Sequence, residues 1–407
     1  MKVRPRIAVV SPFLDKRHGT ERCVAELIER LAKDYDIHLY CGSVRDVTLS
    51  EIKWHRVSRL PGPHLIGYYW FLLANQFQRW WELKFQKTSF DLVFSPGINC
   101  LNSDVIFVHI LFTAFRERMG ERLAFRTNPS RLWPRLMLRR LAYACFAALE
   151  GRVYAREKLF LVVPSQRMAN ELANRFGRRN DVSVVYHGID RQRFNPKVRE
   201  LLRGKARCEL KLGENDFALL LIGNDWQNKG LSSLVEALGE LRNPSLRLLL
   251  VGNDDSARYE SLLAHWKVTP QVRFAPSRPD VEFYYAAADA YVGPSLEDAF
   301  ALPPLEAMAC GLPVIVSRQA GVSELVTHGV DGFILEDPTS SEELAQLVRR
   351  VHQDPTMRQQ LGARAAETAG QYTWKRNAEE MKAVFDKCLR EKRGNAQGSK
   401  LPVVTKP

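Results

Sequence analysis

The chain has 407 residues, of which 45% are hydrophobic and 26% are charged. This composition excludes a disordered or fibrous protein, and the length exceeds the size at which a single hydrophobic core usually stops growing. Lys and Arg outnumber Asp and Glu by 59 to 46, which gives a formal net charge of +13. We therefore expect two globular domains and an anionic partner: a phosphorylated ligand, a nucleic acid or a membrane surface.

The seven cysteines are scattered along the chain, and no two of them form a CxxC motif. This usage predicts a reducing compartment and no structural zinc site. The apolar part of the N-terminus is too short for a secretory signal and is typical of a buried first strand. The longest apolar run, residues 65–74, is much shorter than the roughly 20 residues that cross a bilayer. We expect a cytoplasmic protein that could still bind the inner face of the cytoplasmic membrane.

Short apolar runs alternate with segments of helical periodicity through the first half of the chain. The strand candidates are RIAVVSPF, DIHLYCG, DLVFSP, DVIFVHI and LFLVVPS. The helical segments ERCVAELIERLA and QRMANELANRF follow the first and the last of them. This alternation is typical of βαβ units around a parallel sheet that is covered on both faces. We predict an α/β, doubly wound, Rossmann-like domain over residues 1–180.

The same alternation starts again after the polar segment RRND, which precedes the strand candidate VSVVYHG. Further strand candidates ALLLIGN, LRLLLVGN, VRFAP, AYVGPS and PVIVS predict a second domain of this class over residues 181–371. Residues 372–391 are predicted to form one long helix that packs back on the first domain, and residues 392–407 a disordered tail. Two such domains facing one another would place a ligand cleft at the carboxyl ends of their strands.

The segment from Phe112 to Lys158 is strongly basic and contains interleaved apolar side chains. A basic amphipathic stretch can lie on an anionic membrane surface. A solvated helical face with its apolar side in the core explains the pattern equally well. For the aromatic run from Tyr68 to Trp81, we expect core packing rather than membrane contact. The cations of the basic segment are Arg116, Arg118, Arg122, Arg126, Arg131, Arg135, Arg139, Arg140, Arg152, Arg156 and Lys158.

Residues 296–317, LEDAFALPPLEAMACGLPVIVS, place carboxylates around an apolar run that contains prolines. The pattern predicts a strand, a loop and a short helix whose first N–H groups can bind oxygens of an anionic or sugar ligand. The carboxylate of Glu306 could accept two hydrogen bonds from a vicinal diol such as a ribose, while Asp298 faces a second hydroxylated group. Alternatively, both carboxylates cap the helix and interact with its dipole. Spacing alone does not choose between these interpretations.

The extended motif PSLEDAFALPPLEAMACGLPVIVS resembles the signature of the family 4 retaining glycosyltransferases, in which two acidic residues are separated by seven others. Three further motifs, HGTE, YHGIDRQRF and NDWQNKG, resemble that family's glycine loop, inter-domain turn and phosphate-binding segment, in the family's order. The resemblance covers about residues 5–390. It implies the GT-B fold, with two facing Rossmann-like domains and a cleft between them. The N-terminal domain would bind the acceptor and the C-terminal domain the nucleotide sugar.

Two positions depart from the family pattern. The register gives Asp298 where the family usually has Glu, and Glu297 stands one residue earlier, so either could take the first acidic role. Asn224 occupies a position where many relatives have Arg, which removes one positive charge near the diphosphate. The NDWQNKG segment is also similar to that of the lipopolysaccharide-core glucosyltransferases.

The resemblance implies roles for individual residues. Lys229 would offset the charge that grows on the β-phosphate of the departing nucleoside diphosphate. Gly19 would bring the backbone close to the same diphosphate. His109, which ends the strand DVIFVHI, would contact the donor sugar, and Arg167 could add positive charge near the phosphates. The implied catalytic set is His109, Lys229, Asp298 and Glu306. The implied donor-binding set is Gly19, Asn224, Lys229, Asp298, Ala299, Phe300, Ala301, Leu302 and Glu306, with Glu297 as an alternative carboxylate.

We expect a retaining, metal-independent glycosyltransferase that uses a nucleotide diphosphate sugar, most commonly a UDP-sugar, and needs no cofactor. The acceptor would be a hydroxyl of a glycan or glycolipid in cell-envelope polysaccharide or lipopolysaccharide synthesis. Two other classes remain open. A nucleotide-sugar 2-epimerase shares two facing Rossmann-like domains, and it would change the sugar without any acceptor. A non-enzymatic binder of polyanions or membranes would explain the net charge, and it predicts strongly salt-dependent binding.

Overall fold

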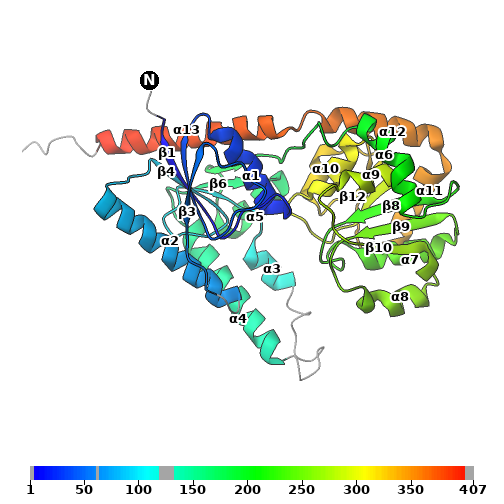
Figure 1. Cartoon of the computed structure of the whole chain (residues 1–407). Helices are drawn as coiled ribbons and strands as arrows, with labels where there is room; N and C mark the ends of the chain where they lie inside the picture. The colour runs from blue at the N-terminus through cyan, green and yellow to red at the C-terminus, as the bar shows by residue number, and fades with distance from the viewer. Residues whose placement is uncertain (1–3, 61–63, 119–132, 399–407) are drawn as a thin grey trace, which may run out of the picture. The chain divides into compact units, whose positions relative to one another are not determined.

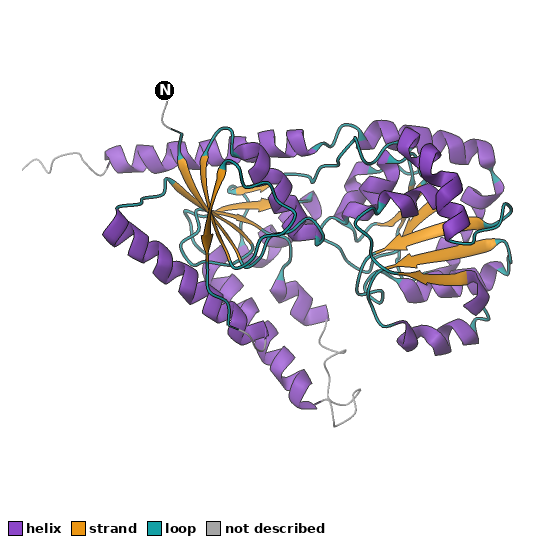
Figure 2. Ribbon diagram, in the orientation of Figure 1, coloured by secondary structure: helices purple, strands orange, loops and turns teal. Residues whose placement is uncertain are grey.

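The computed structural model describes residues 4–60, 64–118 and 133–398, which form two compact units (Figure 1, Figure 2). The first unit comprises the described residues up to Val185 and from Lys375 onward, and the second comprises residues 186–374. The chain therefore leaves the first unit five residues later than the predicted boundary after residue 180. The strand VSVVYHG, which we assigned to the second domain, explains this difference because it pairs with the sheet of the first unit.

The first unit is built on a seven-stranded sheet in the order β3-β2-β1-β4-β5-β6-β7. All of its neighbouring strands run parallel. Strand β1 pairs with β2 on one side and with β4 on the other, so the strand order reverses between β1 and β4. The strands are β1 (Arg6–Ser11), β2 (Asp36–Cys41), β3 (Ile52–Arg56), β4 (Leu92–Pro96), β5 (Val105–Phe107), β6 (Phe160–Val163) and β7 (Val182–Val184).

Helices cover both faces of this sheet (Figure 2). On one face, Ile28 of α1 and Phe385 of α13 join the core with Ile7 of β1. On the other face, Phe71 of α2 packs with Val10. The helices of the first unit are α1 (Gly19–Leu31), α2 (His64–Gln86), α3 (Phe112–Arg118), α4 (Trp133–Tyr154), α5 (Gln166–Phe176) and α13 (Trp374–Gly398).

The terminal helix α13 is longer than the sequence analysis predicted. Residues 392–398, which we assigned to a disordered tail, continue the helix, so that part of the prediction was wrong. They follow a run rich in Lys, Arg and Glu, which are good helix formers. In addition, Lys392 forms an ion pair with Asp104 at 2.9 Å. Residues 399–407 lie outside the described residues.

Helix α2 contains the whole aromatic run, Tyr68 to Trp81, for which we expected core packing. That expectation holds for Phe71 but is wrong for Trp70, Phe77, Trp80 and Trp81, whose side chains are exposed. Helical periodicity explains the split, because residues three and four apart share one face and the run has apolar residues on every face. Among the described helices, none combines the length and the apolar composition needed to cross a membrane.

The second unit repeats the architecture with a six-stranded parallel sheet in the order β10-β9-β8-β11-β12-β13. Its strand order reverses between β8 and β11. The strands are β8 (Phe217–Ile222), β9 (Leu246–Val251), β10 (Val272–Ala275), β11 (Ala290–Gly293), β12 (Val314–Ser317) and β13 (Phe333–Leu335). The helices are α6 (Pro196–Glu209), α7 (Leu231–Leu241), α8 (Glu260–His265), α9 (Glu282–Ala287), α10 (Leu302–Ala309), α11 (Ser341–Gln353) and α12 (Pro355–Ala369).

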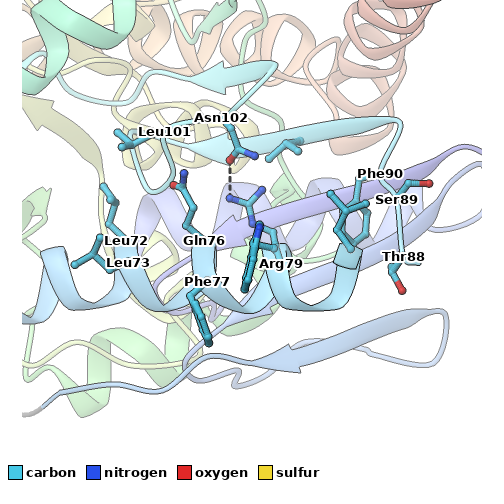
Figure 3. Close-up of a pocket in the computed structure, with 13 residues that line it drawn as sticks. Leu72, Leu73, Gln76, Phe77, Arg79, Thr88, Ser89, Phe90, Leu101 and Asn102 are labelled. Carbon is cyan, nitrogen blue, oxygen red and sulfur yellow. Dashed lines mark hydrogen bonds between the residues drawn. The ribbon is translucent and has the colours of Figure 1, made fainter. Parts of the chain in front are cut away.

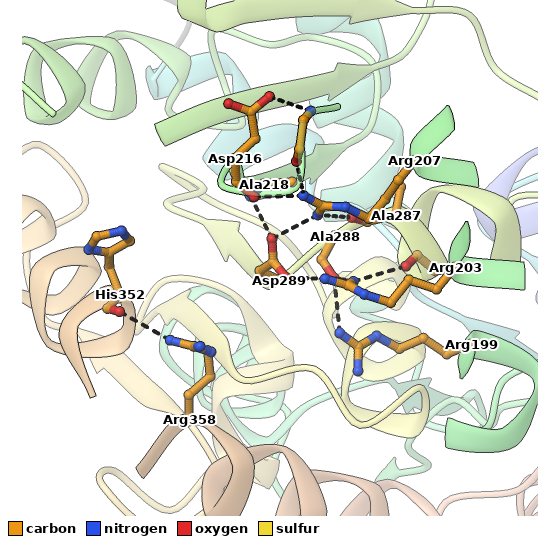
Figure 4. A network of polar contacts seen from close by, with 12 residues as sticks. Arg199, Arg203, Arg207, Asp216, Ala218, Ala287, Ala288, Asp289, His352 and Arg358 are labelled. Carbon is orange, nitrogen blue, oxygen red and sulfur yellow. Dashed lines mark hydrogen bonds and ion pairs between the residues drawn. The ribbon is translucent and has the colours of Figure 1, made fainter. Parts of the chain in front are cut away.

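An arginine cluster on α6 holds the C-terminal end of α9 (Figure 4). Arg199 and Arg203 donate hydrogen bonds to the carbonyl oxygen of Ala288 at 3.0 and 2.9 Å. Arg203 and Arg207 also pair with the carboxylate of Asp289 at 2.5 and 3.2 Å. The last carbonyl groups of a helix have no partner within it, so cationic donors there satisfy them and favour the helix dipole. This network fixes α9 in the unit.

The topology indicates where a ligand could bind in each unit. In open parallel sheets, ligands bind outside the carboxyl ends of the strands, at the point where the strand order reverses. That point lies beyond β1 and β4 in the first unit and beyond β8 and β11 in the second. The loops that follow these strands contain several of the predicted site residues.

Candidate active site

The loops after β8 and β11 bring Lys229 and Asp298 together. The ammonium nitrogen Nζ of Lys229 lies 2.5 Å from the carboxylate oxygen Oδ2 of Asp298. Both side chains are largely buried, with 16% and 21% of their surface exposed. Of the two candidates for the first acidic role, Asp298 is therefore the carboxylate that pairs with Lys229. The sequence separates these residues by 69 positions, and the strand order alone makes them neighbours.

The carboxyl group of Asp298 is held in its charged form. Burial alone would raise the pKa of Asp298. The charge and hydrogen bond of Lys229 and the backbone N–H groups of Phe300 and Ala301 outweigh burial, so the pKa of Asp298 lies below its ordinary value. A carboxylate that accepts such hydrogen bonds is stabilised in its charged form. Asp298 therefore holds the ammonium group of Lys229 at the end of the sheet.

Backbone contacts join the two loops. The side-chain amide of Asn228 donates to the carbonyl oxygen of Glu297 at 2.8 Å. The N–H of Leu296 donates to the carbonyl oxygen of Asn228 at 2.8 Å. Between them, Gly230 has a φ of +77°, and a Cβ at this position would lie 1.9 Å from the carbonyl oxygen of Pro294. Only glycine fits so close an approach, so this residue sets the distance between the loops.

The backbone between Asp298 and α10 has an unusual conformation. Ala301, at the N-cap of α10, has a φ of +70°, a region that residues with a Cβ seldom occupy and that often marks functional sites. The side chain of Phe300 is buried and its ring lies 5.1 Å from that of His187. The side chain of Phe300 is therefore not available to a ligand, which could contact this residue only through its backbone. Ala299 is half-buried in the same loop, and Leu302 begins α10.

Glu306 lies in the second turn of α10 and is almost completely buried. The hydroxyl of Tyr285, on α9, donates a hydrogen bond to its Oε2 at 2.7 Å. Burial, followed by the nearby charge of Glu306, raises the pKa of Tyr285 far above its ordinary value, so the phenol stays protonated and remains a donor. Neither Glu306 nor Asp298 occupies the N-cap, which is Ala301. The alternative that these carboxylates simply cap α10 therefore does not describe this helix.

Asn224 links two loops at the same edge. Its side-chain oxygen accepts a hydrogen bond from the N–H of Asn253, in the loop after β9, at 3.0 Å. The next turn places the side chain of Trp226 in the core, and its backbone N–H donates to the carboxylate of Asp254 at 3.0 Å. Asn224 itself is exposed. The position thus supplies a neutral amide where many relatives would supply a guanidinium.

In the first unit, Gly19, His109 and Arg167 follow the carboxyl ends of β1, β5 and β6. Gly19 begins α1, and a Cβ there would meet no heavy atom within 4 Å. Folding therefore does not require glycine at this position, which leaves open space beside the helix N-terminus. Arg167 lies in the first turn of α5 and is half-buried. The ring of His109 stacks on Phe107 with centroids 4.5 Å apart.

The sequence analysis did not predict two residues of these sites, Asp15 and Tyr285. Asp15 is buried and accepts hydrogen bonds from the N–H groups of Arg17 and His18, both at 2.9 Å, while its Oδ2 lies 2.8 Å from Nδ1 of the His18 ring. The spacing of Asp15 from these donors is typical of an Asx turn and could have revealed it. Tyr285 had no such local signal, because its partner Glu306 lies 21 positions away.

The second unit thus presents one ammonium group, two carboxylates and the N–H of Leu302 at one edge of the sheet, whereas Pro303 and Pro304 in the same turn of α10 have no N–H. A cation and helix N–H groups stabilise phosphate oxygens, and carboxylates accept hydrogen bonds from hydroxyls. This set of groups suits a ligand that combines a phosphate with a sugar. Across the described residues, no group of three or more His, Cys, Asp or Glu side chains is arranged to hold a metal ion.

Comparison with known families assigns the chain. A model for Glycosyltransferase Family 4 matches residues 17–193, and a model for Glycosyl transferases group 1 matches residues 203–368. The chain belongs to family 4 of the glycosyltransferases. The matches leave only the first 16 residues, a short connection and the C-terminal helix and tail uncovered. The family that the sequence motifs resembled is therefore confirmed.

Curated relatives of this family 4 chain include D-inositol 3-phosphate glycosyltransferases. The protein of Corynebacterium diphtheriae is 30% identical over 240 residues, which are 55% of each chain. The protein of Thermobifida fusca is 30% identical over 246 residues, which are 57% of this chain and 56% of the relative. The chain therefore spans about half the length of the curated relatives it matches.

Solved structures confirm the GT-B fold of this family 4 chain. WaaG, described as a glycosyltransferase involved in lipopolysaccharide biosynthesis, has a TM-score of 0.75 at 20% identity, over 93% of this chain and 98% of WaaG. HepE of Anabaena, in complex with UDP and glucose, has a TM-score of 0.68 at 18% identity, over 93% of this chain and 99% of HepE. At these identities the similarity establishes the fold alone.

Tyr285→Phe tests whether the phenol positions Glu306. Removing the hydroxyl leaves a buried carboxylate oxygen without its donor, which costs about 1–3 kcal/mol. We expect the dissociation constant for the nucleotide-sugar donor to rise about tenfold in calorimetric titration. Tyr284→Phe is the matched control, because the hydroxyl of Tyr284 on the same helix donates to the carbonyl oxygen of Pro276 at 2.7 Å. Equal donor affinities in the two variants would contradict the positioning role.

His109 should be neutral throughout the physiological range. Burial of its ring lowers its pKa to about 4, whereas an unfolded histidine titrates near 6.5. The unfolded chain therefore binds the additional proton between these values, so this residue contributes stability above about pH 6.5 that is lost as the pH falls towards 4. NMR of histidine-labelled protein, assigned with His109→Asn, should detect no titration of this ring from pH 5.5 to 8. A midpoint near 6.5 in the folded protein would overturn the prediction.

Proposed function

We propose that this chain transfers a sugar from a nucleotide diphosphate sugar to a hydroxyl of a glycan or glycolipid, with retention of the anomeric configuration. The single observation that supports this best is the Lys229–Asp298 pair at the strand-order reversal of the second unit. Relatives of the same family are named glycosyltransferases. Neither of the two alternative classes, an epimerase or a non-enzymatic binder, is favoured by an observation of its own.

The proposed donor is a UDP-sugar. Lys229 and the N–H of Leu302, the one donor in the first three residues of α10, would bind the diphosphate. Glu306 would accept hydrogen bonds from a sugar diol. The HepE structure, which has the same fold, is a complex with UDP and glucose. With Asn224 in place of an arginine, most of the positive charge for the diphosphate in this loop would come from Lys229. The two candidates in the first unit, Gly19 and Arg167, would add an N–H group and a guanidinium.

The proposed chemistry is attack by the acceptor hydroxyl on the face from which the diphosphate leaves. The bond between the anomeric carbon and the phosphate oxygen breaks, the new glycosidic bond forms, and the hydroxyl proton passes to the departing diphosphate. Negative charge grows on the β-phosphate, where the ammonium group of Lys229 stabilises it in a largely buried setting. Asp298 would hold that ammonium group in place. The neutral imidazole of His109 would contact the donor sugar.

The proposed acceptor belongs to cell-envelope polysaccharide or lipopolysaccharide synthesis. WaaG is described as a glycosyltransferase involved in lipopolysaccharide biosynthesis, and the net charge of +13 suits a phosphorylated or lipid-linked acceptor. We propose a cytoplasmic protein that associates peripherally with the membrane through the basic segment 112–158. Arg135, Arg139 and Arg140 of that segment are exposed on α4, whereas Arg122, Arg126 and Arg131 lie outside the described residues.

A thermal-shift screen against UDP-, GDP-, ADP- and TDP-sugars tests the donor class. A ligand that binds only the folded state adds about 2.7 kcal/mol of stability at a hundredfold excess over its Kd. We expect a higher melting temperature with UDP-sugars. Glu306→Ala should abolish this shift, and Lys229→Ala should slow transfer about a hundredfold. If both variants bound the donor and transferred sugar at the rates of the wild-type protein, the assigned site would be refuted. If the protein converted the nucleotide sugar to an isomer with no acceptor present, it would be an epimerase.

Transfer should not require a metal ion. The proposed charge stabilisation uses the Lys229 ammonium group and backbone N–H groups, so chelation of divalent cations should leave the rate unchanged. The measurement is the transfer rate of purified protein with and without excess EDTA, followed by addition of Mg²⁺. Loss of activity with EDTA and recovery with Mg²⁺ would contradict the proposed metal independence.

A further inference from the structure

The long helix α2 has its polar and apolar faces reversed relative to an ordinary surface helix. Asn75, Arg79 and Glu82 lie three or four residues apart on one face, and all three are buried. The opposite face is apolar and exposed. A helix on the surface of a soluble domain normally turns its apolar stripe towards the core. Helix α2 does the opposite over its last three turns.

Specific contacts hold the polar face against the sheet. Arg79 donates to the side-chain oxygen of Asn102 at 2.7 Å, a contact visible in Figure 3. The carboxylate of Glu82 accepts a hydrogen bond from the hydroxyl of Tyr40 and lies 3.2 Å from Nδ1 of His55. Buried polar groups that are paired in this way specify one orientation, because rotation of the helix would leave them unsatisfied. The rotation of α2 about its axis is therefore fixed, and its aromatic face points outward.

The exposed face is a continuous stripe. Ile66, Trp70, Leu73, Phe77 and Trp80 follow one another at intervals of four, three, four and three residues, which places them on one side of the helix. Trp81, Leu83 and Phe85 widen the stripe at its end. These eight side chains are between 42% and 65% exposed. An apolar exposed patch of this kind marks an interaction site on a soluble protein.

Two hollows flank the stripe. One has a volume of about 630 Å³ and is lined by residues of α2 and by Phe90 and Leu101 (Figure 3). The other has a volume of about 430 Å³ and lies towards Arg56. Leu73 and Phe77 line both hollows and therefore form the ridge between them. Because Phe90 and Leu101 precede β4 and β5, the first hollow lies at the amino ends of these strands, away from the candidate site residues of this unit.

The exposed charged side chains of α2 and α4 all have one sign. Helices α2 and α4 each contain one carboxylate, Glu82 and Glu150, and both are buried. The two helices pack together, since the rings of Tyr68 and Phe146 lie 4.8 Å apart. Their exposed side therefore combines apolar groups with cations and no exposed carboxylate. The exposed cations of the two helices are Lys84, Arg135, Arg139, Arg140 and Arg152.

We propose that the exposed stripe of α2 is a docking surface for an anionic lipid membrane. Trp and Phe beside Lys and Arg are the side chains that partition into the interface between headgroups and acyl chains. The ridge of Leu73 and Phe77 enters this interface, and the neighbouring cations contact the headgroups. This surface would bring the proposed enzyme to a lipid-borne acceptor, and only that consequence rests on the proposed function.

A second copy of the chain fits the stripe less well than a membrane. A symmetric dimer would bring the same patch of both copies together. Lys84, whose ammonium nitrogen lies 5.1 Å from the ring centroid of Trp80 in the stripe, would then enter the contact from both copies without an exposed carboxylate of α2 to balance it, and like charges in a contact are destabilising. An anionic lipid surface has the opposite sign and satisfies both the apolar and the cationic groups.

The test is binding of the full chain to vesicles, measured by flotation in the absence of any nucleotide sugar. We expect strong binding to vesicles of phosphatidylglycerol and phosphatidylethanolamine, and at least tenfold weaker binding to phosphatidylcholine. A triple variant of α2 should bind the anionic vesicles at least tenfold more weakly; its substitutions are Leu73→Ser, Phe77→Ser and Trp80→Ser. Arg135→Gln, Arg139→Gln and Arg140→Gln combined should lower it mainly at low salt, because salt screens exposed charges.

Exposed apolar residues of the second unit provide the matched control. Leu201 and Val330 are 81% and 43% exposed, so Leu201→Ser and Val330→Ser combined remove exposed apolar groups far from α2 in sequence and in the other unit. This variant should bind vesicles as the wild type does. Donor-induced thermal shifts should be unchanged in every variant, because none of these residues belongs to the candidate active site and all are exposed.

These measurements distinguish the docking surface, a dimer interface and the proposed function from one another. Loss of vesicle binding in the α2 variant alone supports the docking surface. Wild-type protein that does not float with anionic vesicles overturns it, as does an α2 variant that still binds them. A wild-type dimer that the α2 substitutions convert to a monomer, with vesicle binding unchanged, would assign the stripe to a second copy instead. Absent donor binding with normal vesicle binding would refute the proposed function and leave the docking surface standing.

Discussion

The ion pair between Lys229 and Asp298 is the interaction on which the candidate site depends. It joins the two loops that follow β8 and β11, the strands on either side of the strand-order reversal. A lysine has a long, flexible side chain whose ordering costs conformational entropy. A largely buried carboxylate that remains charged offsets this cost and holds the ammonium group in one place. The tight approach at Gly230 then keeps the two loops at the distance that the pair requires.

Support for the second carboxylate comes from farther away in the unit. Glu306 is buried in α10 and receives its hydrogen bond from Tyr285 on α9. The C-terminal end of α9 is in turn held by Arg199 and Arg203 of α6. Each step satisfies a group that would otherwise be buried without a partner, so the chain of contacts is rigid. The position of one acidic oxygen at the site thus depends on three helices.

In the first unit, buried polar contacts determine which face of helix α2 is exposed. The buried groups of Arg79 and Glu82 fix α2 so that Phe77 and its apolar neighbours face outward. Hydrophobic burial alone would favour the reverse orientation. A buried charged group that loses its hydrogen-bond partners is costly, so the contacts of Arg79 and Glu82 outweigh the exposure of the aromatic stripe.

The amino-acid sequence by itself determined the two parallel α/β units and the family, because buried strands read as continuous apolar runs and because motifs such as LEDAFALPPLEAMACGLPVIVS are local. It missed two edge strands: β3, which is polar on its exposed face, and the short β13. It also placed β7, at the start of VSVVYHG, in the wrong unit. Tertiary structure alone decided which carboxylate pairs with Lys229, which phenol contacts Glu306 and which face of α2 is exposed. These are contacts between residues distant in the chain, or a choice between faces that are both apolar in part, and periodicity contains no information about either.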